Sequence, residues 1–77
     1  MTQQETKDQI AQCLITAAEK RRDKVAESSD PYQTAHEQFG IAFVANNLYF
    51  ADLIDFSAHK QLDEIREGAF KIAGESL

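Results

Sequence analysis

Three side chains late in the sequence have the residue types and the spacing of a metal-binding helix face. Asp55, His59 and Asp63 recur at every fourth position. In a helix, this spacing places two carboxylates and an imidazole on one side, and divalent metals accept such ligands. The alternative is a solvated acidic face with His59 as a surface residue. We favour the solvated face, because the Glu-x-x-His pairs of helical di-iron sites are absent from the sequence.

Other patterns that carry chemistry are incomplete. The run Asp63-Glu64-x-x-Glu67 resembles the acidic helices of small helical nucleotide pyrophosphatases. That family needs a second acidic pair, and Glu19 or Asp23 would have to supply it at a spacing that does not match. The sequence has no glycine-rich phosphate loop and no nucleophile elbow. We therefore predict a non-enzymatic protein without metal or cofactor, and keep a metal-dependent helical enzyme as an alternative.

Aromatic and aliphatic residues gather in the stretch 39–56, which contains no Lys or Arg. A helix through this stretch would be apolar on two sides, and such a helix needs neighbours on both sides. The sequence thus predicts a central helix within a three-helix arrangement or a dimer. One row of this helix would hold Phe39, Phe43, Asn46, Phe50 and Leu53, and the other Ile41, Val44, Leu48 and Ala51.

Polar groups among these apolar residues are candidates for contacts with a partner. Asn46 falls in the aromatic row, where its amide needs a hydrogen-bond partner, either across an interface or within its own chain. Tyr32 and Tyr49 combine an apolar ring with a hydroxyl, a combination that is enriched at interfaces. The predicted partner or dimer interface comprises Tyr32, Phe39, Phe43, Asn46, Tyr49, Phe50 and Leu53.

The formal net charge of the 77 residues is −5, and the acidic excess is uneven. Residues 28–56 contain four acidic residues and no Lys or Arg. Because an acidic chain repels nucleic acid and anionic membranes, we expect no direct contact with either. The predicted acidic surface is Asp52, Asp55 and Asp63. Such a surface would mimic nucleic acid toward a basic protein, as small phage-encoded inhibitors do.

The amino-terminal segment and the single cysteine bear on location. Residues 1–5 are polar and show no signal peptide. Cys13 has no second cysteine with which to form an internal disulfide, and this suits a reducing compartment. We therefore expect a cytoplasmic protein.

Capping residues divide the chain into helices. Thr2 with Glu5 forms a capping box, and Asp30-Pro31 supplies an N-cap followed by a proline at the first helical position. We predict one all-α domain over residues 1–77, with helices at about 3–27, 31–56 and 58–73. The arrangement would be an antiparallel helical hairpin plus a shorter third helix. A single long bent helix from Pro31 to Ile72 is the alternative.

These features together favour a small interaction protein. We expect a regulator, inhibitor or adaptor that binds another protein through its helices and forms a homodimer, because a chain of this length has a marginal core of its own. The alternative is a secretion-type co-chaperone that masks an apolar segment of a client. The turn Asp30-Pro31-Tyr32 resembles the turns of such helical hairpin proteins.

Overall fold

The computed structural model describes residues 2–40 and 45–74, and every regular element within them is a helix. The all-α prediction is therefore confirmed. The four helices are α1 (Gln3–Glu27), α2 (Pro31–Phe39), α3 (Ala45–Phe50) and α4 (Phe56–Gly74).

Side-chain caps fix the starts of α1 and α2. Thr2 is the N-cap of α1, and its hydroxyl accepts a hydrogen bond from the Glu5 amide at 3.0 Å. Asp30 is the N-cap of α2, its carboxylate accepts from the Gln33 amide at 3.2 Å, and Pro31 occupies the first turn. The predicted starts of both helices are confirmed.

The predicted helix over 31–56 is wrong, because α2 ends at Phe39 and Gly40 is its C-cap. A Cβ atom at Gly40 would lie 2.4 Å from the carbonyl oxygen of His36, so this backbone conformation requires glycine. In the predicted continuous helix, Gly40 would lie in the interior and would only weaken the helix. The predicted Phe43 lies outside the described residues.

A second break separates α3 from α4. Asp52 adopts a left-handed conformation with φ of 62°, and its amide donates to the Tyr49 carbonyl at 2.9 Å. The Leu53 amide donates to the Leu48 carbonyl at 3.0 Å. These two bonds form a Schellman motif, which ends a helix and reverses the chain. Helix α4 then begins at Phe56, two residues before the predicted start at 58.

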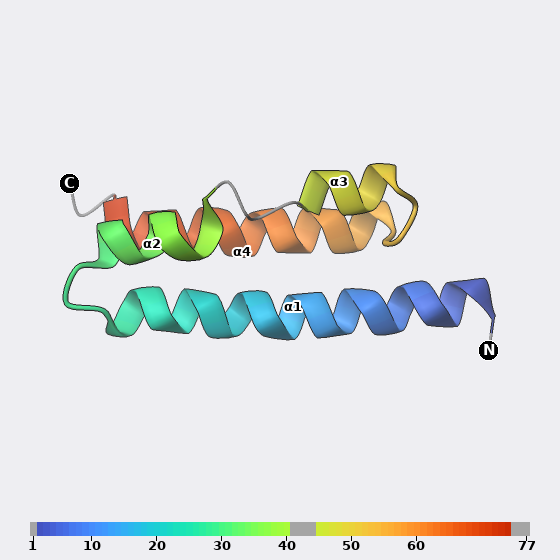
Figure 1. The fold of residues 1–77 in the computed structure, drawn as a ribbon, viewed down its shortest axis with the longest axis horizontal. Coiled ribbons are helices and arrows are strands. Elements are labelled where there is room, and N and C mark those ends of the chain that lie inside the picture. Colours follow the sequence, from blue (N-terminus) through green and yellow to red (C-terminus); the bar gives the residue numbers. More distant parts are fainter. Residues whose placement is uncertain (1, 41–44, 75–77) are drawn as a thin grey trace.

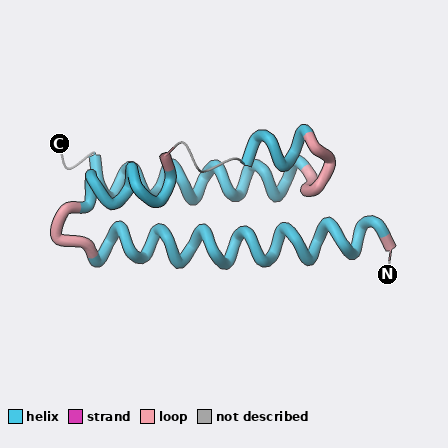
Figure 2. Tube along the Cα trace, viewed as in Figure 1, coloured by secondary structure: helices cyan, strands magenta, loops and turns pink. Residues whose placement is uncertain are grey.

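The helices form a rod of about 44 × 19 × 17 Å in which α1 extends along the whole length (Figure 1). The segment containing α2 and α3 returns antiparallel to α1, and α4 runs parallel to α1 (Figures 1 and 2). Helix α1 contacts α2 and α4, while α3 packs on α4. The described residues do not show the predicted hairpin of two long helices, since the returning segment is broken.

The core is built largely from alanine, which allows close approach of the helices. The largest fully buried side chains are Phe39, Ile54, Leu62 and Val25. The remaining buried apolar residues are Ala18, Ala35, Ala58, Ala69 and Ala73. Within the described ranges, no helix combines the length and the apolar character needed to cross a bilayer.

Candidate protein interface

The residues of the predicted aromatic row do not share one face. Phe39 is fully buried in the core at the end of α2, whereas Asn46 is exposed on α3. The predictions that Phe39 contributes to an interface and that Asn46 lies in an apolar seam are therefore not supported by their positions. The break at Gly40 is the physical reason, because helical periodicity carries a face forward only through an unbroken helix.

The other predicted residues fall in two places. Tyr32 is half exposed on α2, where its ring packs on that of His36 with centroids 4.6 Å apart. Phe50 is 81% exposed at the end of α3, and Leu53 is 44% exposed in the turn that follows. Tyr49 is partly buried beside them. The structure thus brings Tyr49, Phe50 and Leu53 together and leaves Tyr32 on a different helix.

Four rings from α3 and α4 form a continuous surface that we call the aromatic patch, made of Tyr49, Phe50, Phe56 and His59. Tyr49 is at its centre. Its ring centroid lies 5.4 Å from that of Phe50 and 5.7 Å from that of Phe56. It also stacks on His59 at 5.4 Å with an angle of 15° between the ring planes. Because Phe56 is 59% exposed and Phe50 more so, much of this ring surface faces outward.

His59 connects the aromatic patch to the body of α4. Its ring is partly buried and lies 5.9 Å from that of Phe56. Its Nδ1 atom is buried and has no hydrogen-bond partner within the described part of the chain. His59 is thus a packed, partly buried member of the patch, stacked on Tyr49.

The turn that carries the aromatic patch is tied to the start of α1 by polar contacts. The Lys7 ammonium lies 2.6 Å from a carboxylate oxygen of Asp52 and 3.8 Å from one of Asp55. The Gln4 amide donates to the other oxygen of Asp55 at 2.6 Å. The hydrogen bond that Lys7 donates to Asp52 raises the pKa of Lys7 above its usual value of 10.5, with the charges of both carboxylates adding to the effect.

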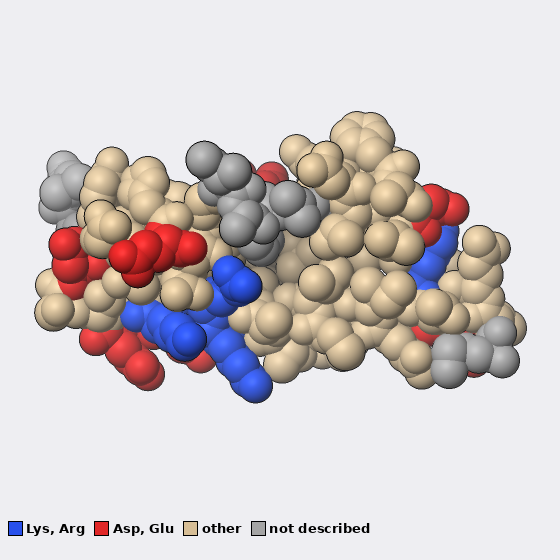
Figure 3. All heavy atoms as spheres, in the orientation of Figure 1, with Lys and Arg blue, Asp and Glu red and all other residues tan. Residues whose placement is uncertain are grey.

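These contacts reduce the negative charge that the predicted acidic surface presents. Asp52 and Asp55 share one cation, so their charge is partly offset. Figure 3 shows blue atoms beside red ones at the end of the molecule where α1 begins, and uncharged tan atoms over α3. Asp63 lies eight residues after Asp55, about 12 Å further along the helix direction. The three carboxylates therefore do not form one compact cluster.

The described residues contain no group of three His, Cys, Asp or Glu side chains that could hold a metal ion. Asp55, His59 and Asp63 are accordingly not gathered around a common point. Asp55 lies before the start of α4 and contacts Lys7, while the His59 ring packs on Tyr49.

Sequence reasoning missed three residues of this site. Phe56 and His59 were assigned to a helix end and to a polar face, although their i, i+3 spacing already places them on one side of a helix. No local sequence pattern could identify Lys7 as part of this site. It is 45 residues away from Asp52, and only the tertiary fold brings the two together.

Comparison of the chain with protein families, with curated proteins and with solved structures found no match.

Proposed function

We propose that this chain is a non-enzymatic interaction protein that binds an apolar segment of another protein on the aromatic patch. The observation that carries this proposal is the exposure of Phe50 and Phe56, at 81% and 59%, on adjoining elements. Leu53 extends the apolar surface into the turn between them. Contiguous exposed apolar surface of this kind marks interaction sites, whereas single exposed apolar residues are common on any protein.

The energetics favour such a role. Burial of one large apolar side chain contributes about 1.5–3 kcal/mol, so covering two phenyl rings and a leucine supplies a useful share of a binding free energy. The rings cost little side-chain entropy to fix, since Tyr49 already packs against both phenyl rings and His59. Aromatic side chains in this setting are the residue types that dominate binding energy at interfaces.

The homodimer and the cytoplasmic location belong to the same proposal. A second copy placing its own patch on the first would bury the same rings, and the small alanine-rich core gives a reason for it to do so.

The free thiol of Cys13 is exposed on α1, which suits a reducing compartment. A nucleic-acid-mimicking surface has weaker support, because Lys7 offsets the charges of Asp52 and Asp55.

Site-specific photo-crosslinking in cells that naturally express the protein tests the proposal. A benzophenone amino acid replaces Phe50 in one variant and Ile72 in a control variant. Ile72 is also exposed, at 43%, but lies near the far end of α4. We expect position 50 to give a discrete adduct with another protein, and position 72 to give none of that mass. An adduct of twice the monomer mass at position 50 would identify the homodimer.

A matched variant links the adduct to the rings. With the benzophenone at position 50, Phe56→Ser should greatly reduce the adduct, and Ile72→Ser should leave it unchanged. No adduct at position 50, or equal adducts at positions 50 and 72, would contradict the proposal. Circular dichroism of each variant checks that the helices are retained.

A further inference from the structure

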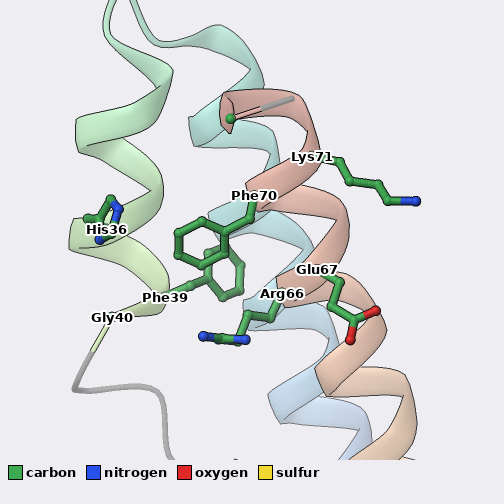
Figure 4. A pocket seen from close by; sticks show the side chains of 8 residues that line it. His36, Phe39, Gly40, Arg66, Glu67, Phe70 and Lys71 are labelled. Atoms are coloured by element: carbon green, nitrogen blue, oxygen red, sulfur yellow. The ribbon is translucent and has the colours of Figure 1, made fainter. Parts of the chain in front are cut away.

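A groove of about 570 Å³ lies between the last turns of α2 and the second half of α4, away from the aromatic patch. Figure 4 shows the rings of Phe39 and Phe70 in the space between the two helices. The groove is lined by His36, Phe39, Gly40, Arg66, Glu67, Phe70, Lys71 and Gly74. The volume falls within the range of small-molecule sites, which bury most of a ligand on an apolar surface with few polar groups.

Arg66 lies close to the Phe70 ring. Its guanidinium carbon lies 5.2 Å from the centroid of the Phe70 ring, a cation–π distance. Figure 4 shows the guanidinium just below the rings, while Glu67 and Lys71 point toward the opposite side. Among the described residues, no ion pair or hydrogen bond is formed by the Arg66 side chain, which is partly buried.

The charge around the groove differs from that of the whole chain. Arg66 and Lys71 outweigh Glu67 there, whereas the chain as a whole has a net charge of −5. A guanidinium with open donors beside an apolar surface matches a carboxylate, since its planar fork binds two carboxylate oxygens at once. The partly buried ring of Phe70 offers a flat apolar contact for the rest of the ligand.

We infer that this groove binds a small aromatic carboxylate. The aromatic body lies against the partly buried ring of Phe70, and the carboxylate accepts hydrogen bonds from the Arg66 guanidinium. His36 flanks the ring surface, edge-on to Phe70 with centroids 5.3 Å apart. Gly40 keeps the end of α2 free of a side chain at the groove. This site is independent of the aromatic patch and of the proposed protein partner.

Titration of the ¹⁵N-labelled full chain with 2-naphthoate, followed by amide chemical shifts, tests the inference. We expect shifts centred on Gly40, Arg66, Phe70 and Gly74, with saturation at millimolar ligand or below. The uncharged 2-naphthamide has the same rings and should bind about tenfold more weakly, because it cannot form the charge-assisted pair with Arg66.

Paired charge variants on α4 separate binding from a general effect on the helix. Arg66→Gln should weaken 2-naphthoate binding about tenfold or more, whereas Glu67→Gln should strengthen it because it removes the one carboxylate of the lining. Lys60→Gln makes the same charge change as Arg66→Gln at an exposed position outside the groove, and should leave binding unchanged.

Opposite changes in 2-naphthoate affinity from Arg66→Gln and Glu67→Gln cannot come from loss of structure. Circular dichroism of each variant checks the fold. Three results would overturn the inference: no saturable shifts at the groove, equal binding of 2-naphthoate and 2-naphthamide, or unaltered binding by a folded Arg66→Gln protein.

Discussion

At the scale of single residues, two backbone positions decide where helices stop. Gly40 ends α2 because its missing Cβ leaves room for the His36 carbonyl. Asp52 stops the helical hydrogen bonding that follows α3. It does so in a left-handed conformation that most residues adopt only at a cost in free energy. Asp52 retains a compensating contact, since its carboxylate pairs with Lys7. Asp52 thereby sets where the chain leaves α3, next to Phe50 and the aromatic patch.

Gly40→Ala should destabilise the protein. The new Cβ would lie 2.4 Å from the His36 carbonyl oxygen, so the backbone must shift, and we expect a loss of about 1–3 kcal/mol in unfolding free energy. Urea denaturation followed by circular dichroism measures this loss. Gly74→Ala is the matched control, since a Cβ there has nothing within 4 Å among the described atoms. Equal midpoints for both variants would refute the steric account of Gly40.

At the scale of elements, the contact between the start of α1 and the turn over residues 51–55 holds the aromatic patch in place. Lys7 and Gln4 come from one helix, and Asp52 and Asp55 come from a turn more than forty residues later. Exposed ion pairs contribute little on their own, but Asp55 accepts from Gln4 while it also contacts Lys7. The contacts of Lys7 and Gln4 with Asp52 and Asp55 therefore serve mainly to orient the turn.

The contribution of Lys7 should depend on pH in a defined direction. Its pKa is raised in the folded protein, so its stabilising effect is present below its usual pKa of 10.5 and is lost as pH rises through the higher folded value. Lys7→Gln should therefore lower the melting temperature at pH 9, and the difference from wild type should shrink above pH 10.5.

Thermal melts of wild type, Lys7→Gln and Lys20→Gln across this pH range measure the effect. Lys20 is exposed on the same helix and forms no ion pair with the described residues, so its variant should follow the wild type. A constant difference between Lys7→Gln and wild type through pH 11 would show that the ion pair is not its cause.

At the scale of the whole molecule, a rod only 17–19 Å thick leaves few positions far from solvent. Ile54 is one of them, at 1% exposure, although it lies in the turn between α3 and α4 and not in a helix. It fixes this turn to the core, much as Lys7 fixes it to α1. A core to which the described residues contribute four large fully buried side chains has little stability to spare.

Ile54→Ala should cost about 2–5 kcal/mol of unfolding free energy, enough to unfold a marginal domain or to leave it partly unfolded at 25 °C. Ile72→Ala removes the same atoms at an exposed site and should cost less than about 1 kcal/mol. Chemical denaturation of both variants gives the comparison. A near-equal cost would mean that the turn is not anchored through Ile54.

The sequence by itself determined the helical class and the local signals of the chain. Thr2 and Asp30-Pro31 cap helices with groups only a few residues away, so their effect can be predicted without the fold. The apolar richness of residues 39–56 likewise predicted that this stretch would need apolar neighbours. Phe39 became core and Phe50 became surface.

Only the tertiary structure decided which residues share a surface. Helical periodicity assigned Phe39, Asn46 and Phe50 to one face, but the phase is lost at Gly40, where a close approach to the His36 carbonyl ends the helix. The rings of Tyr49 and His59, and the charges of Lys7 and Asp52, meet through contacts between distant segments. Such contacts depend on where the chain reverses, and local residue patterns do not encode that position strongly enough to predict it.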